Sequence, residues 1–132
     1  MRDLDHARLM LSLARDELNA LEVMLETALV TPAIFGFHAQ QAVEKSLKAW
    51  LSLLGREYPL THNLLELFCL VEDTADGTPC EFRDLHKLTP FAVRFRYEDL
   101  DSGGMRIDRQ GILERVRRFY LHVDHLVESA SS

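Results

Sequence analysis

The sequence contains little cysteine: Cys69 and Cys80 are the only two in 132 residues. Two cysteines are too few for the disulfide framework that stabilises small secreted domains. No charged segment followed by an apolar one opens the chain, and no apolar run is long enough to span a membrane. These absences argue against a disulfide-rich secreted protein and against a membrane protein. We therefore expect a reduced, soluble protein of the cytoplasm.

Positive charge is also scarce, because 15 Lys and Arg face 21 Asp and Glu, for a formal net charge of −6. A general affinity for nucleic acid relies on Lys and Arg to neutralise phosphates, so this balance argues against it. The charge is uneven, however: residues 1–82 hold six Lys/Arg and 13 Asp/Glu, whereas residues 83–132 hold nine and eight. This distribution is therefore compatible with a local basic face in the last third of the chain.

Several other signatures are missing. Gly103-Gly104 lacks the following Lys and Ser or Thr of a Walker-type phosphate loop, so ATP hydrolysis is not supported. The six histidines show no zinc-ligand spacing, since His122 and His125 have no third ligand placed to complete a site. No segment shows the alternation of apolar and polar residues that is typical of a β-strand. No internal repeat or linker divides the chain. We expect no cofactor, no metal and a single domain over residues 1–132.

Apolar residues recur instead at the three- and four-residue spacing of amphipathic helices. The first such stretch predicts a helix that is capped by Asp3, runs to about Leu29 and is closed by Thr31-Pro32, because residues before proline avoid helical angles. Its apolar residues are Leu4, Ala7, Leu11, Ala14, Leu18, Leu21, Leu25 and Ala28. The second stretch predicts a helix over about 33–54, which Gly55 ends.

Two shorter helices are predicted in the middle of the chain. Thr61 or Asn63 can cap a third helix, and Asn63, with Glu66 three residues on, has the spacing of a capping box. A short fourth helix, which Pro90 ends, is predicted from the apolar residues Phe82, Leu85 and Leu88.

The last part of the chain predicts a loop and a final helix. Residues 91–106 mix aromatic, basic and acidic types around Ser102-Gly103-Gly104 and predict an extended, mobile loop. Asp108 can cap the last helix, in which residues 129–132 should fray. We therefore expect an all-α fold, an up-and-down bundle of four to five helices.

Polar residues share one side of the second predicted helix, next to its apolar side. They are Gln40, Gln41, Glu44, Lys45 and Lys48. Two interpretations stay open: a solvated helix side whose Glu44–Lys48 pair contributes roughly a few tenths of a kcal/mol, or a polar patch that binds a partner or a nucleotide. His62, which follows a candidate cap, is either a local hydrogen-bonding residue or part of such a site.

The chain around this polar side resembles the signature of the HEPN domain family, whose name stands for higher eukaryotes and prokaryotes nucleotide-binding. Three elements carry the resemblance: Gln-Gln-Ala-x-Glu-Lys-x-Leu-Lys at 40–48, Thr-His-x-Leu at 61–64 and Arg-Tyr at 96–97. The order and length of the predicted helices also agree over nearly the whole chain. The resemblance implies a bundle of four or five helices that is usually a homodimer. It also implies a partner encoded nearby, a minimal nucleotidyltransferase, with which the protein forms a complex or a toxin–antitoxin pair.

Some proteins of this family are metal-independent ribonucleases that use an Arg followed by a His after four to six residues. The His supplies a base or acid, and the Arg stabilises the charge of the phosphorane. This spacing occurs from Arg117 to His122 and from Arg118 to His125. Both pairs lie further along the last helix than the family places its motif, and Asp124 stands where the toxin branch has a Tyr. Catalysis by Arg117 and His122 is one hypothesis, and a degenerate or absent nuclease site is the other.

Arg94, Arg96 and Tyr97, with Arg106 and Arg109 beyond them, form a further candidate site. Guanidinium groups match phosphate oxygens, and a tyrosine ring can stack on a base. Ion pairs with the neighbouring acidic residues explain the same residues equally well. Our leading hypothesis is a non-catalytic, dimeric partner of a minimal nucleotidyltransferase that binds a nucleotide or RNA and no membrane. The alternatives are a ribonuclease toxin and a structural adaptor without a ligand.

Overall fold

The computed structural model describes residues 3–74, 80–92 and 107–131, and these ranges contain helices and no strand. The α-helices are α1 (Leu4–Met24), α2 (Pro32–Leu53), α3 (Leu64–Thr74), α4 (Cys80–Arg83) and α6 (Arg109–Ser131). A 3-10 helix, η1 (Asp84–Ala92), follows α4 directly. The expected all-α bundle is therefore confirmed.

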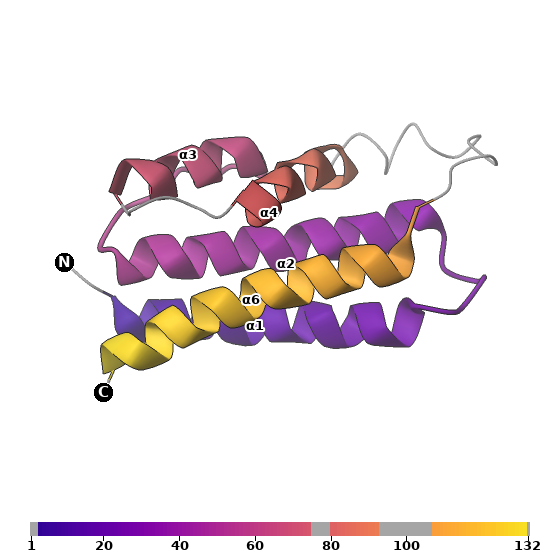
Figure 1. Cartoon of the computed structure of the whole chain (residues 1–132), viewed down its shortest axis with the longest axis horizontal. Helices are drawn as coiled ribbons and strands as arrows, with labels where there is room; N and C mark the ends of the chain where they lie inside the picture. Colours follow the sequence, from indigo (N-terminus) through magenta and orange to yellow (C-terminus); the bar gives the residue numbers. More distant parts are fainter. Residues whose placement is uncertain (1–2, 75–79, 93–106, 132) are drawn as a thin grey trace.

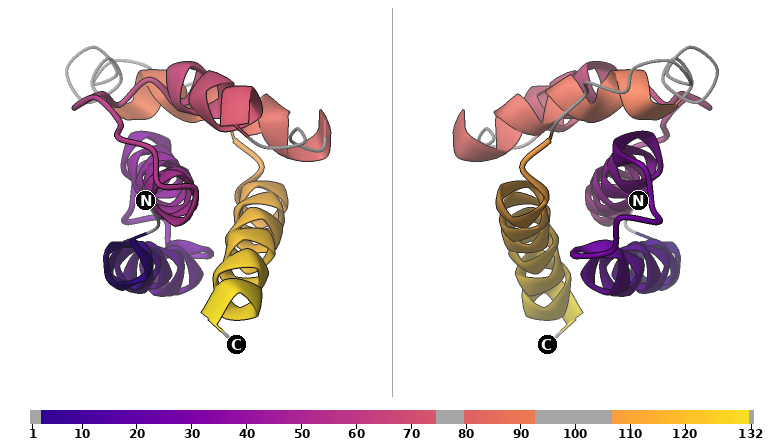
Figure 2. Two further views of the ribbon diagram at one scale, coloured as in Figure 1. Left: turned by 90° about the vertical axis from the view of Figure 1, so that its left-hand side faces the viewer. Right: turned by 90° about the vertical axis from the view of Figure 1, so that its right-hand side faces the viewer.

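The three long helices α1, α2 and α6 lie side by side, and α3, α4 and η1 form a shorter layer across them (Figure 1). Viewed end on, this layer reaches from above α2 toward α6 (Figure 2). The core between the helices is filled by large side chains that are fully buried, among them Phe35, Phe68, Phe119, Leu21 and Leu47. Burial of these apolar surfaces is the main stabilising contribution to the bundle.

Side-chain caps define where the helices begin. The carboxylates of Asp3 and Asp108 and the amide oxygen of Asn63 each accept the backbone N–H three residues on, at 3.0, 3.0 and 3.3 Å. The predicted caps Asp3 and Asp108 are therefore confirmed, and of the two candidates for the third helix it is Asn63 that caps it. In a capping box, the side chain of Glu66 would also accept the backbone N–H of Asn63. Here its carboxylate instead accepts a hydrogen bond from the hydroxyl of Thr61, at 3.3 Å.

Helix α1 is shorter than predicted, since it ends at Met24 rather than near Leu29. The cause lies far away in the sequence. The guanidinium of Arg109 donates to the backbone carbonyls of Met24 at 2.8 Å, of Thr27 at 3.2 Å and of Val30. These bonds hold the chain between α1 and α2 in turns instead of a further helical turn. Arg109 is thus a structural residue, and its guanidinium is already occupied.

The predicted fourth helix is observed as two consecutive elements, α4 and η1, and its predicted end at Pro90 is wrong. Pro90 lies inside η1 and does not end it, because a proline removes only one hydrogen bond from a short 3-10 helix whose side chains Leu85, Leu88 and Phe91 are buried. The predicted loop therefore begins later than residue 91, and its residues 93–106 lie outside the described part of the chain.

The C-terminal end of α6 is longer than predicted, because the helix continues to Ser131 instead of fraying from residue 129. Val127 is fully buried, and Ala130 packs against the core. Apolar contacts therefore hold the last turn in place.

Candidate functional site

The polar side of α2 is not a solvated helix face. Gln40 is fully buried, and its Nε2 donates to Oε1 of Glu44 and to the carbonyl of His62, both at 3.0 Å. Gln41 donates in turn to Oε1 of Gln40 at 2.7 Å. Gln40 thus connects α2 to the segment that precedes α3, and Gln41 binds the other end of the Gln40 amide.

Glu44 is the centre of this network and is only 4% exposed. Its Oε1 lies 2.7 Å from Nδ1 of His62, and its Oε2 accepts a hydrogen bond from Nζ of Lys48 at 3.0 Å. Burial raises the pKa of Glu44, but the hydrogen bonds from Gln40, His62 and Lys48 and the charge of Lys48 outweigh it. The pKa therefore lies below its ordinary value, and the carboxylate is charged at neutral pH.

The network extends from α2 to the N-terminal end of α1. Nζ of Lys48 lies 5.4 Å from the ring centre of Tyr58, whose hydroxyl is 2.7 Å from Nε2 of His6. Burial, followed by the charges of Glu44 and Asp3, raises the pKa of Tyr58. The phenol therefore keeps a proton that it can donate to the imidazole.

Lys45 takes part in a separate cluster between α2 and α1. Its Nζ donates to Oε1 of Glu17 at 3.2 Å, and Nδ1 of His38 lies 2.8 Å from the other oxygen of that carboxylate. Every predicted binding residue of α2 is thus bonded within the chain. The other predicted set, Arg94, Arg96 and Tyr97, lies outside the described residues.

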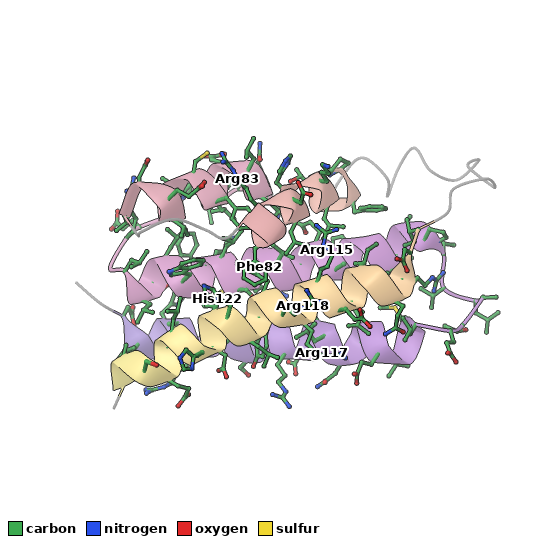
Figure 3. All side chains as sticks on the ribbon, viewed as in Figure 1. Phe82, Arg83, Arg115, Arg117, Arg118 and His122 are labelled. Atoms are coloured by element: carbon green, nitrogen blue, oxygen red, sulfur yellow. The ribbon has the colours of Figure 1, made fainter. Side chains whose placement is uncertain are left out.

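Arg117 and His122 lie on different edges of α6, because five residues turn an α-helix by about 140° from the starting direction. Arg117 forms an ion pair with Glu22 of α1 and points away from α4 (Figure 3). The imidazole of His122 packs against Trp50 of α2 and Phe82 of α4, with ring centres 5.4 and 5.3 Å away. Within one chain, this pair does not converge on a common phosphate.

A different set of basic residues shares one edge of α6. Arg115, Arg118 and His122 follow the i, i+3, i+7 spacing that aligns side chains along a helix. They stand on the side of α6 that faces Phe82 (Figure 3). The two arginines are exposed, and the histidine is partly exposed. We call these three residues the basic edge.

Sequence reasoning missed the basic edge because it applied the nuclease spacing of four to six intervening residues. That spacing selected Arg117, which the helical turn places on the other edge. The signal was nevertheless present, since both arginines and the histidine share one helical phase.

The family comparison agrees with this bundle. The HEPN domain family matches residues 7–126, from the first turn of α1 to near the end of α6. The chain belongs to the HEPN domain family. The resemblance of the sequence to this family is therefore confirmed. No curated protein and no solved structure matches it.

Two further observations concern the described part of the HEPN chain. Within residues 3–74, 80–92 and 107–131, no three His, Cys, Asp or Glu side chains gather where a metal ion could bind. In the same ranges, no helix combines the length and the apolar character needed to cross a membrane.

Proposed function

We propose that this HEPN chain is a non-catalytic binding protein that holds the phosphate groups of a nucleotide or RNA on the basic edge of α6. One observation carries the proposal: two exposed arginines and a partly exposed histidine share that edge in a chain of net charge −6. Guanidinium forks match phosphate oxygens, and an imidazole N–H adds a further donor. Membership of the HEPN domain family supports a nucleotide or nucleic acid as the ligand.

The polar residues of α2 are a weaker ligand site. Gln40 and Glu44 are buried and already make hydrogen bonds with each other and with His62. A ligand on this side would have to break those bonds, and an unpaired buried group costs about 1–3 kcal/mol. The signature residues of α2 therefore stabilise the bundle, whereas the basic edge of α6 is accessible to a ligand from solvent.

Replacing Arg115 and Arg118 together with Gln is expected to weaken binding of a fluorescein-labelled oligouridylate by about tenfold or more at 0.1 M salt. Each lost phosphate contact removes one contribution from counterion release. The slope of log affinity against log salt should fall by about one unit for each arginine. Fluorescence anisotropy at several salt concentrations measures both quantities.

Arg117→Gln is the matched control for Arg115→Gln and Arg118→Gln made singly, because it also removes one positive charge from the same helix, at a residue that pairs with Glu22 on the other edge. We expect its affinity and its salt slope to stay close to wild type. If Arg117→Gln and each arginine variant of the basic edge weakened binding equally, net charge alone would explain the result and the proposal would fail.

We also propose that the chain acts as a homodimer and as the partner of a minimal nucleotidyltransferase, which the family resemblance supports. The rival function is a ribonuclease, and one observation favours it: Arg118 and His122 lie four residues apart on the same edge of α6. An Arg–His pair therefore reaches one side of the helix, although with one intervening residue fewer than the ribonuclease motif.

Incubation of the purified protein with structured RNA in the absence of metal separates the two functions. We expect no cleavage, together with co-purification of the neighbouring nucleotidyltransferase when the two genes are expressed together. Cleavage that disappears in His122→Ala would instead establish the ribonuclease. Cleavage that survives in His122→Ala would contradict the assignment of that histidine as a catalyst.

A further inference from the structure

We infer that Trp50 and Phe82 are positioning residues that hold the imidazole of His122 for phosphate binding. The inference rests on the proposed function, since it concerns the same basic edge. Neither aromatic residue is expected to touch the ligand, because both side chains are buried in the core. Their effect on binding would therefore pass through His122.

The two rings enclose His122 from two different elements. The Trp50 ring of α2 meets the imidazole edge to face, with 66° between the planes, and the Phe82 ring of α4 is tilted against it at 45°. The edge-to-face arrangement is one that aromatic pairs prefer, and both centre distances, 5.4 and 5.3 Å, lie in the usual range for aromatic pairs. The imidazole thus has an aromatic wall on each of two sides while part of it stays accessible to solvent.

Both aromatic rings that enclose His122 also contact a residue of α6. The rings of Trp50 and Phe82 also pack on Phe119, with ring centres 6.2 and 5.3 Å away, and Phe119 is fully buried three residues before His122. The same helix that carries the histidine therefore fixes the walls around it. A side chain held in this way has already lost rotamer freedom, so ligand binding costs less entropy.

The chain offers a matched control for this arrangement. Phe68 of α3 is fully buried and also packs its ring on Phe119, at 5.5 Å. Among the described side chains, its ring contact is with Phe119 and not with His122. Phe68→Leu and Phe82→Leu therefore remove similar core contacts, but Phe82→Leu alone also removes a wall of the imidazole.

The test is whether His122→Gln still weakens ligand binding when the Phe82 ring has been removed. Affinity for the labelled oligouridylate is measured for His122→Gln in the wild-type, Phe82→Leu and Phe68→Leu backgrounds, after thermal unfolding shows that each variant is folded. We expect His122→Gln to weaken binding about threefold to tenfold in the wild-type and Phe68→Leu backgrounds, as the loss of one hydrogen bond does. In the Phe82→Leu background we expect no further loss.

The outcomes separate this inference from the proposed function. An undiminished effect of His122→Gln in the Phe82→Leu background, or no effect in wild type, would overturn the inference while the arginine variants still tested the function. If Arg115→Gln and Arg118→Gln left the affinity at the wild-type value, both the proposed function and this inference would be overturned. If Phe82→Leu does not fold, Trp50→Phe takes its place in the same cycle, because it alters the other wall and keeps an aromatic ring in the core.

Discussion

Glu44→Ala is expected to lower the free energy of unfolding by about 3–5 kcal/mol, the cost of removing one partner from a buried ion pair. The substitution leaves the Gln40 amide and the Lys48 ammonium without the carboxylate that each one contacts at 3.0 Å. Burial is what makes the loss large, since the solvent cannot replace the missing hydrogen bonds. Urea unfolding followed by circular dichroism measures it.

Glu17→Ala is the matched control, because Glu17 also binds one histidine and one lysine, His38 and Lys45. Its side chain is 16% exposed, however, compared with 5% for Glu44. We expect a smaller loss than for Glu44→Ala, because the pairs of Glu17 are only partly buried and solvent can replace part of what is removed. Equal losses for the two alanine variants would contradict the central role of the buried carboxylate.

The same carboxylate should make stability depend on acid. Because the pKa of Glu44 is lower in the folded chain than its ordinary value of 4.5, its contribution is complete above that pH. The contribution is lost as the pH falls through the folded pKa. The difference in unfolding free energy between wild type and Glu44→Ala should therefore shrink as the pH falls from about 4.5 through the lower folded pKa. A difference that grows on acidification would mean that burial, not hydrogen bonding, dominates the pKa.

Gly36→Ala is expected to destabilise the protein by about 1–3 kcal/mol, the usual cost of overpacking a core. Alanine normally stabilises a helix relative to glycine by roughly 0.5–1 kcal/mol. Here, however, a Cβ at Gly36 would lie 2.3 Å from Cδ1 of the buried Phe91 ring. The new methyl group would push η1 away from α2. Urea unfolding again measures the change.

Two variants check this explanation. Phe91→Leu should recover part of the loss in the Gly36→Ala background, because a smaller side chain leaves room for the methyl group. At Gly111 a Cβ would lie 2.3 Å from Oδ2 of Asp108, which is the end of an exposed side chain that can turn aside. We expect Gly111→Ala to change stability by less than about 1 kcal/mol, since the helix gains propensity while the cap weakens. A similar loss at both glycines would contradict a specific clash with Phe91.

The helices could be predicted from the sequence because their determinants are local. The caps Asp3, Asn63 and Asp108 and the apolar spacing of α2 and α6 depend on residues within a turn or two of each other. The end of α1 could not be predicted in this way. Its determinant, Arg109, lies 85 residues from Met24, and no periodic pattern relates two residues so far apart.

The candidate site was less predictable than the fold for a similar reason. The polar side of α2 reads as an exposed face in the sequence, and only the packing of the segment around His62 shows that Gln40 and Glu44 are buried. Spacing alone also pointed to Arg117, although the helical turn directs it toward Glu22. The aromatic walls of His122 come from α2 and α4, which spacing within α6 cannot reveal.

The hydrogen bonds of Arg109 also bear on the order of folding. The connection from the end of α1 to α2 is local in sequence, yet three carbonyls along it accept hydrogen bonds from Arg109, the first residue of α6. Contacts between distant residues form late, because a long loop has to close first. During synthesis the first two helices can therefore pair early, whereas the connection between them reaches its final shape only after the last helix emerges.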